Sequence, residues 1–253
     1  MPSFRLAKQI FYGLLYFAVF FGIISGIYFG FLRNSATCFD GRENQGEEDT
    51  DCGGPCEPCE IRALVPLTVS AVKVLPAGES ITLFAEVRNP NFTFGAFSFI
   101  YTFEALDETG AVVTTVSGES FLYPGEIRYF VESAAGVALP QTRRANFKIE
   151  NTTWKRREEF ATPLMQFREV RTEMKQDGTL ATSGVIVNGE TVPFRRLMVG
   201  AIYVDQLGAV VGASKTELRD VKPFEERFFQ IAHPAIPGAN LRATKLYFEG
   251  KRP

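Results

Sequence analysis

The chain has 253 residues, with 27 basic and 29 acidic side chains and a formal net charge of −2. This near balance excludes the strongly basic surface that is typical of nucleic-acid-binding proteins. A hydrophobic content of 45% excludes an intrinsically disordered chain. Many of the 24 phenylalanines lie in alternating apolar runs, which favours β-structure.

The first predicted element is a membrane-spanning helix at residues 10–32, IFYGLLYFAVFFGIISGIYFGFL, which contain no charged side chain. As a helix this run would be about 35 Å long, enough to cross a hydrocarbon core of about 30 Å. Arg5 and Lys8 precede the run, whereas Arg33 is followed by an acidic stretch. The positive-inside rule therefore predicts a cytoplasmic tail at residues 1–9 and an extracytoplasmic remainder, with the protein anchored in the cell membrane.

Two other interpretations of this segment were weighed. A cleaved signal peptide is disfavoured, because the apolar run is too long for an ordinary h-region and no clear small-x-small site follows it. Lipid attachment at Cys38 would need a lipobox, which Ser35-Ala36-Thr37 resembles poorly. We therefore expect an uncleaved single-pass anchor.

Small residues recur at every fourth position of the apolar run, at Ala18, Gly22, Gly26 and Gly30. On a helix this spacing forms one groove, where the backbone of a second helix can approach closely. Self-association of the helix is one interpretation. The other is that glycine is simply common in membrane helices.

An acidic, cysteine-rich neck follows at residues 33–61, and it holds all four cysteines, Cys38, Cys52, Cys56 and Cys59. In an oxidising space outside the membrane, an even number of cysteines favours two disulfides. The sequence permits three disulfide connectivities among these four cysteines. We favour an interlocked pair, Cys38 with Cys56 and Cys52 with Cys59, since Gly53-Gly54-Pro55 supplies a tight turn between them.

The neck also carries oxygen ligands at short spacing, which suit calcium, and the candidates are Asp40, Asn44, Glu47 and Asp51. The register of an EF-hand loop is absent, and a solvated acidic spacer is the simpler interpretation. Zinc on four thiolates would suit a cytosolic location better. A thioredoxin-like redox role for Cys56-Glu57-Pro58-Cys59 has less support than zinc binding, because no βαβ pattern surrounds this motif.

The spacing of the neck, C-x-D-G-x2-N-x2-E-x3-D-C-G-G-x-C-x2-C, resembles a short cysteine module of bacterial extracellular and envelope proteins. Its positions are Cys38, Asp40, Gly41, Asn44, Glu47, Asp51, Cys52, Gly53, Gly54, Cys56 and Cys59. The resemblance covers 22 residues, 38–59. It implies a location outside the cytoplasm and no established activity.

After Pro66 the apolar residues alternate with polar ones, which predicts half-buried strands. The segment ITLFAEV would point one set of side chains inward, at Ile81, Leu83, Ala85 and Val87. The segment AFSFIYTFEAL would do the same with Phe97, Phe99, Tyr101, Phe103 and Ala105.

Residues 104–130 align with residues 202–229 at a nearly constant offset, which indicates a duplicated domain. The matching pairs are Asp107 with Asp205, Gly110 with Gly208, Pro124 with Pro223, Arg128 with Arg227, and Phe130 with Phe229. Turn signals every 8–12 residues are typical of antiparallel sandwiches. We expect a mainly β protein: one N-terminal transmembrane helix, then two tandem antiparallel β-sandwich domains at 62–157 and 158–253.

The two copies resemble FxLYD and water-stress (late-embryogenesis-abundant) sandwiches, which are fibronectin-III-like. The resemblance is carried by the Asp-x-x-Gly-x-Val-Val hairpins at 103–113 and 202–211 and by the Pro-led strand after each. Such signatures imply a fold more than a function.

No G-x-S-x-G elbow, HExxH helix or phosphate-binding glycine loop is present, and the one histidine, His233, lies beside prolines. We therefore expect a protein that is not an enzyme and that has no cofactor except, at most, calcium. The expected function is binding or scaffolding in the cell envelope, with other envelope proteins or a second copy of the chain as partners. A calcium-dependent sensor or accessory subunit acting through the neck is the alternative.

Overall fold

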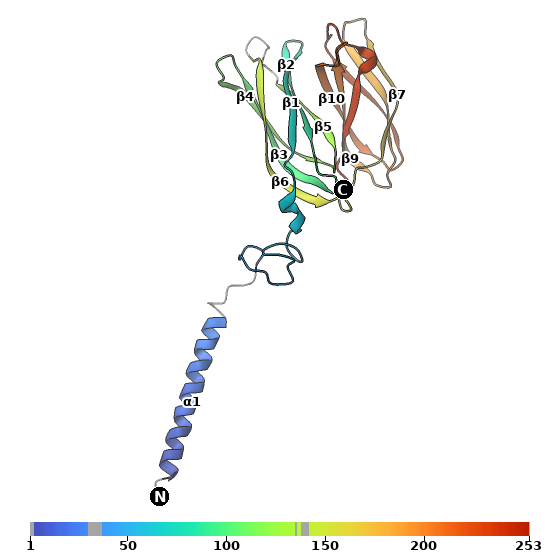
Figure 1. The fold of residues 1–253 in the computed structure, drawn as a ribbon. Helices are drawn as coiled ribbons and strands as arrows, with labels where there is room; N and C mark the ends of the chain where they lie inside the picture. The colour runs from blue at the N-terminus through green and yellow to red at the C-terminus, as the bar shows by residue number, and fades with distance from the viewer. Residues whose placement is uncertain (1–2, 30–36, 135, 138–141, 253) are drawn as a thin grey trace. The chain divides into compact units, whose positions relative to one another are not determined.

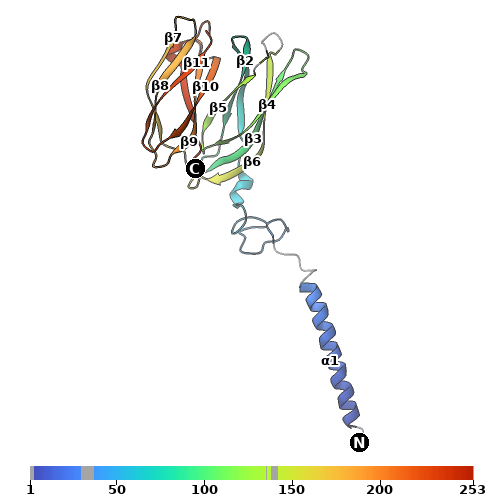
Figure 2. The same cartoon turned by 180° about the vertical axis from the view of Figure 1, so that it is seen from behind.

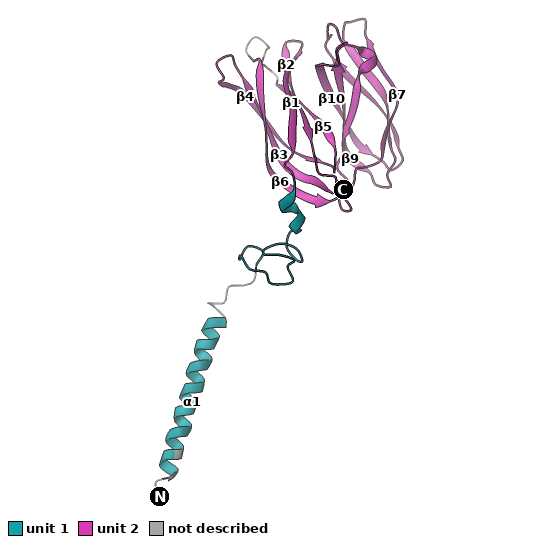
Figure 3. Ribbon diagram, in the orientation of Figure 1, with its two compact units in different colours: residues 1–64 teal, residues 65–253 magenta. Residues whose placement is uncertain are grey.

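The computed structural model describes residues 3–29, 37–134, 136–137 and 142–252. The chain divides into two compact units, residues 1–64 and residues 65–253 (Figure 3). The first unit contains helix α1 (Ser3–Ile27) and a short 3-10 helix, η2 (Cys59–Ala63). The expectation of a mainly β protein with one N-terminal apolar helix is confirmed.

The described part of the second unit consists almost entirely of strands (Figures 1 and 2). In the first half these are β1 (Thr68–Ala77), β2 (Ser80–Arg88), β3 (Phe94–Leu106), β4 (Val112–Leu122), β5 (Ile127–Ala134) and β6 (Arg144–Arg156). In the second half they are β7 (Met165–Met174), β8 (Leu180–Asn188), β9 (Phe194–Val204), β10 (Val210–Val221), β11 (Glu226–His233) and β12 (Lys245–Glu249), with the 3-10 helix η4 (Leu241–Ala243) before β12.

The two halves have the same topology over the described strands. The first half forms the antiparallel sheets β1-β2-β5 and β4-β3-β6, and the second half forms β7-β8-β11 and β10-β9-β12. Each strand of the first half therefore has its counterpart six strands later in the chain. The predicted boundary between residues 157 and 158 falls in the connection between β6 and β7.

The same turn hydrogen bonds also occur in both halves. Oδ1 of Asp107 accepts hydrogen bonds from the backbone N–H groups of Thr109 and Ala111, each at 2.9 Å. Asp205 Oδ1 accepts from Leu207 and Ala209 at the same distances. Asp107 also accepts a hydrogen bond from the side chain of Thr109, and this bond is the main reason that the pKa of Asp107 lies below its usual value. The matching aspartates of the sequence alignment thus shape matching hairpins.

A buried asparagine fixes the corresponding loop of each half. Asn89 donates its amide to the carbonyls of Phe94 and Tyr123, and Asn188 donates to those of Val192 and Lys222. Both side chains are fully buried. Buried backbone carbonyls need such donors, because leaving one unpaired costs about 1–3 kcal/mol.

Each half has its own hydrophobic core between its two sheets. Ile81, Leu83, Ala85 and Val87 of β2 lie in the first core, as the alternation predicts. On β3 the prediction is correct for Phe99, Tyr101, Phe103 and Ala105. It is wrong for Phe97, which packs with Phe121, Tyr123 and Phe160 in a separate cluster. A register shift in the pairing of β3 after Ala96 interrupts the alternation there.

A third cluster joins the two halves into one unit. It contains Leu75, Phe84 and Val131 from the first half and Ile202, Ala213 and Tyr247 from the second. These side chains lie on the sheets β1-β2-β5 and β10-β9-β12, which therefore pack against each other. The result is a stack of four sheets, and both views show β4 at one side and β7 at the other (Figures 1 and 2).

Candidate functional site

Helix α1 is long and apolar enough to cross a membrane, and the candidate span is Phe4–Ile27. It begins before the predicted start at residue 10, because helical structure continues through the polar residues that flank the apolar run. Ala18, Gly22 and Gly26 are exposed along it, and a Cβ atom added at either glycine would meet nothing within 4 Å. Gly30, with the rest of residues 30–32, lies outside the described residues. Self-association through this groove stays a prediction.

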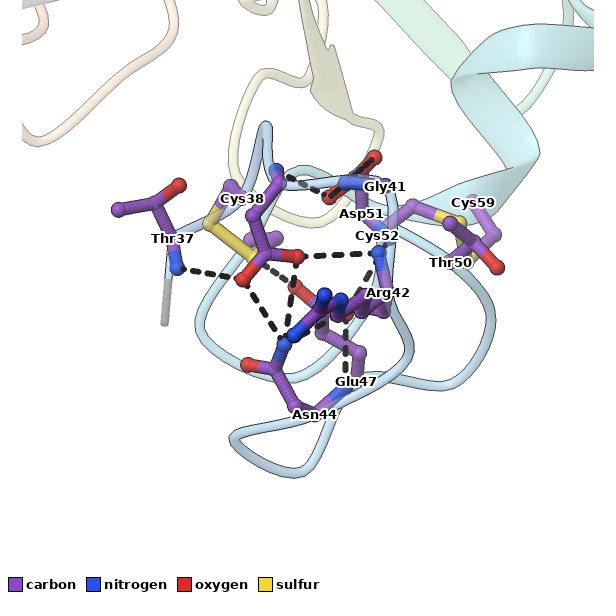
Figure 4. The surroundings of a disulfide bond; sticks show 12 residues. Thr37, Cys38, Gly41, Arg42, Asn44, Glu47, Thr50, Asp51, Cys52 and Cys59 are labelled. Carbon is purple, nitrogen blue, oxygen red and sulfur yellow. Dashed lines mark hydrogen bonds between the residues drawn. A yellow bond between two sulfur atoms is a disulfide. The ribbon is translucent and has the colours of Figure 1, made fainter. Parts of the chain in front are cut away.

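The neck contains the disulfides Cys38–Cys56 and Cys52–Cys59 (Figure 4). This is the interlocked connectivity that we favour from the sequence. All four cysteines of the chain fall within the described residues, and none of them is free. The neck therefore offers no thiolate for zinc, and Cys56 and Cys59 do not form a C-x-x-C redox pair with each other.

The four candidate calcium ligands lie together, and the carboxylate oxygens of Asp40, Glu47 and Asp51 accept hydrogen bonds from within the neck (Figure 4). The side-chain oxygen of Asn44, in contrast, is buried and has no hydrogen-bond partner within the described residues. The Asp51 carboxylate accepts from the backbone N–H groups of Asp40 and Gly41, at 2.9 and 3.0 Å. The Asp40 carboxylate accepts from Asn44 Nδ2 at 3.0 Å. This hydrogen bond from Asn44 is the main reason that the pKa of Asp40 lies below its usual value.

Glu47 is the most enclosed of these acids, with 8% of its surface exposed. Its Oε2 accepts from the backbone N–H groups of Asn44 and Asp51, at 3.1 and 3.2 Å. Its Oε1 lies 3.2 Å from Cys56 Sγ, which carries no proton because it belongs to a disulfide. The acids Asp40, Glu47 and Asp51 thus order the backbone of the neck through hydrogen bonds, and calcium binding by the neck stays a prediction.

The second unit holds a buried ion cluster that the sequence did not indicate. Arg128 on β5 is 1% exposed, and its Nε and Nη2 donate to the two carboxylate oxygens of Glu126, both at 2.8 Å. Its Nη1 lies 3.7 Å from Oε1 of Glu249 on β12. The ring of Phe121 lies 4.2 Å below the guanidinium carbon. The cluster therefore connects the two halves through charge as well as apolar contact.

Beside this cluster is a cavity of about 760 Å³ between the halves. Strands β3, β4 and β5 of the first half line it with residues that include Tyr101, Tyr129 and Glu132. Strands β9, β10 and β12 of the second half contribute Arg195, Lys215, Tyr247, Glu249 and others. The sequence could not reveal this site, since its residues come from six strands spread over most of the second unit.

His233 lies at the end of β11 and has a structural environment. It is 4% exposed, its Nδ1 lies 2.7 Å from the carbonyl oxygen of Pro234, and its ring contacts that of Tyr203 edge-on. Burial holds the pKa of His233 below its ordinary value. Trp154, the single tryptophan, packs against the core of the first half.

The chain was compared with known proteins. No protein-family model matches it, and no curated protein sequence matches it. The likenesses of the neck to an envelope-protein module and of the halves to FxLYD-type sandwiches therefore remain resemblances.

Proposed function

We propose that this chain is a single-pass protein of the cell membrane that holds a rigid double sandwich outside the cytoplasm to bind other envelope proteins. One observation carries the proposal: a single chain joins an exposed apolar helix to a neck closed by two disulfides, both within the described residues. Disulfides persist in oxidising spaces and are rare in the cytosol. Arg5 and Lys8 at the start of the helix favour a cytoplasmic N-terminus.

The orientation can be tested with an amine-reactive reagent that does not cross membranes. Intact cells that express the full chain are labelled, and the modified lysines are identified by mass spectrometry. We expect exposed lysines of the second unit, such as Lys222 and Lys245, to be labelled, and Lys8 to be labelled only after the membrane is opened. The reverse pattern would contradict the orientation.

The edge strands of the second unit support a binding function, because an open edge can accept a partner strand. Strand β4 is an edge strand, and its sequence VVTTVSGESFL carries one charge, at Glu119. Strand β7 is also an edge, but it carries four charges, at Arg168, Glu169, Arg171 and Glu173. Charges of this kind block strand addition. We therefore place the partner at β4.

A photoreactive amino acid at Thr115, an exposed position of β4, tests this placement in intact cells. The matched control carries the same group at Arg171, an exposed position of β7. A specific adduct from Thr115 that is absent from the Arg171 variant supports binding at β4. Equal adducts from both strands, or none, would count against it.

Association of two copies through the helix is the second part of the proposal, and the exposed groove of Ala18, Gly22 and Gly26 supports it. Gly26→Ile would fill this groove. In a membrane dimerisation assay we expect the variant to lose most of the signal, while Val19→Ile, outside the small-residue series, keeps it. An unchanged signal for Gly26→Ile would leave the abundance of glycine as the explanation.

A further inference from the structure

The cavity between the halves has the size and lining of a small-ligand site. Its volume of about 760 Å³ lies in the range of known ligand pockets, about 300–1,000 Å³. The two halves pack through the cluster that contains Phe84 and Tyr247, so the walls of the cavity are fixed by a shared core. A site that is already formed binds a ligand without the cost of ordering its walls.

Three of the seventeen lining residues are tyrosines, and glycines make room for two of them. Tyr101 pairs across β3 and β4 with Gly118, where an added Cβ would lie 2.5 Å from the tyrosine hydroxyl oxygen. Tyr247 pairs with Gly200, where an added Cβ would lie 1.9 Å from Cε1 of the tyrosine. The ring of Tyr129 meets that of Tyr247 edge-on, with centroids 5.7 Å apart. Aromatic side chains in a pocket wall can give a flat ligand ring the offset or edge contacts that aromatic pairs prefer.

Two carboxylates of the lining, Glu132 and Glu249, lie beside cations of the protein. Glu132 accepts hydrogen bonds from Tyr101 Oη at 2.7 Å and from Lys215 Nζ at 2.8 Å. Glu249 accepts from Ser120 Oγ at 3.0 Å and lies beside the guanidinium of Arg128. Glu132 is therefore paired with a cation of the lining, whereas Glu249 shares the charge of Arg128 with Glu126.

Among the cations of the lining, Arg195 is exposed and has no hydrogen-bond or ion-pair partner within the described residues. Its neighbour Arg196 is paired with Glu217 at 2.7 Å. Lys251 donates to the carbonyl of Phe97 at 2.7 Å and pairs with no carboxylate in the described part of the chain. Glu119 is the remaining acid, and it accepts a hydrogen bond from Ser98. The lining as a whole carries four cations, Arg195, Arg196, Lys215 and Lys251, against three acids, Glu119, Glu132 and Glu249, and this excess of one positive charge favours an anion.

We propose that this cavity binds a flat aromatic ring that carries a carboxylate, with the ring among Tyr101, Tyr129 and Tyr247 and the carboxylate on Arg195. The guanidinium of arginine presents paired donors that match the two oxygens of a carboxylate. The same chemistry is found in free aromatic acids and in an aromatic residue at the carboxyl end of a peptide.

Saturation-transfer NMR on the full chain in lipid nanodiscs tests the proposal with three probes. Each probe is a phenyl ring on a two-carbon chain, and the three differ in the group at the end of that chain. These are 3-phenylpropanoate, its neutral amide 3-phenylpropanamide, and the cation 2-phenylethylammonium. We expect the carboxylate to bind and the amide and the cation to bind about two- to fivefold more weakly, as the loss of an exposed ion pair predicts. Equal binding of the three, preference for the cation, or no binding of any probe would overturn it.

Variants locate the site. Arg195→Glu should weaken the binding of 3-phenylpropanoate at least about twofold by removing the ion pair. Arg171→Glu, the same change at an exposed position of the outer strand β7, should leave it unchanged. The thermal unfolding of both variants shows that each is folded. If Arg195→Glu is folded and binds as the wild type does, the assignment of Arg195 is wrong.

A second set of probes distinguishes a free aromatic acid from an aromatic residue at the carboxyl end of a peptide. N-acetyl-Gly-Gly-Phe is compared with 3-phenylpropanoate and with the same peptide as its carboxamide. A tighter peptide acid points to a chain terminus, and a tighter 3-phenylpropanoate points to a free acid, and either supports the site. A peptide amide that equals the peptide acid would contradict a role for the carboxylate. The outcome is independent of membrane orientation and of binding at β4, so it can fail while those proposals stand.

Discussion

The guanidinium of Arg128 and the carboxylate of Glu249 lie 3.7 Å apart, although they belong to opposite halves of the duplicated unit. Burial acts to lower the pKa of Arg128, but Glu126 and then Glu249 raise it above its ordinary value. The arginine is thus held charged in a place that excludes water. Its counterpart in the second half, Arg227, pairs with Glu225 but is 35% exposed.

This difference predicts unequal effects of the same substitution. Arg128→Met would leave Glu126 and Glu249 without their buried counter-charge, and breaking a buried pair in this way costs about 3–5 kcal/mol. Arg227→Met removes a solvated pair, which is worth at most about 1 kcal/mol. Chemical denaturation of both variants measures the two losses. Equal losses would mean that contact with the second half adds nothing to the role of Arg128.

The sequence predicts the duplication and much of the first core correctly, and the reason is visible at Ile81 and Leu83. Regular alternation assigns one face of a strand to a core, and the turn residues Asp107 and Asp205 fix where the hairpins lie. The prediction fails at Phe97, because a register shift moves a side chain to the other face and leaves no mark in the pattern.

The contact between the halves and the cavity beside it could not be predicted. Alternation places Phe84 and Val131 on the face away from the first core, and it cannot say whether water or another sheet covers that face. In the structure both are buried against Ile202 and Tyr247. The neck was more predictable, since covalent pairing of four cysteines leaves few choices, whereas the hydrogen bonds of Glu47 depend on the folded backbone.

Strain at Phe224 gives a second prediction. Phe224 has φ 56° and is 66% exposed, while Gly125 occupies the same turn of the first half with φ 70°. A left-handed conformation costs an L-residue about 1–2 kcal/mol and costs glycine little. Phe224→Gly should therefore stabilise the protein by about 0.5–1 kcal/mol, a net effect because glycine is also more flexible when unfolded.

The reciprocal variant provides the control for that turn. Gly125→Phe should destabilise the protein by at least about 1–2 kcal/mol, since it introduces the same strain. It also removes the place where the ring of Phe92 packs, 2.8 Å from an ideal Cβ at residue 125. Thermal unfolding compares both variants with the wild type. A loss of stability in Phe224→Gly would show that the exposed ring makes contacts worth more than the strain.

His233 predicts a pH dependence. Its folded pKa lies below the unfolded value near 6.5, because the ring is buried. The unfolded chain therefore takes up the proton first as the pH falls, and stability that is present above about pH 6.5 is lost as the pH drops toward the folded pKa. Nε2, the nitrogen that would receive this proton, is buried and has no hydrogen-bond partner in the described residues.

The measurement compares the wild type with His233→Gln between pH 7.5 and pH 5.0, above the range in which most carboxylates titrate. We expect the midpoint of thermal unfolding to fall with pH in the wild type and to fall less in the variant, whatever the stability of the variant at pH 7.5. Parallel curves for the two proteins would show that another group accounts for the acid sensitivity.

The last prediction concerns the neck, whose order rests on covalent bonds more than on a core. Phe39 is 92% exposed, and Cys52 is the buried hydrophobic side chain of the described segment 37–59. Segments this small cannot bury enough apolar surface to remain folded unaided, and a disulfide typically contributes about 2–4 kcal/mol. Replacing Cys38 and Cys56 together by serine should therefore open the loop that Asp40, Asn44 and Glu47 order, since their hydrogen bonds are individually weak. Limited proteolysis of the full chain should then cut within residues 38–59 much faster than in the wild type, while the fragment 65–253 stays intact because it is a separate compact unit.

Non-reducing mass spectrometry of the wild type should give Cys38 linked to Cys56 and Cys52 linked to Cys59. Addition of calcium to the double variant separates the two explanations of the acidic residues: protection of the neck would show that the carboxylates bind the ion, and unchanged cleavage would leave them the backbone-ordering role seen in the structure.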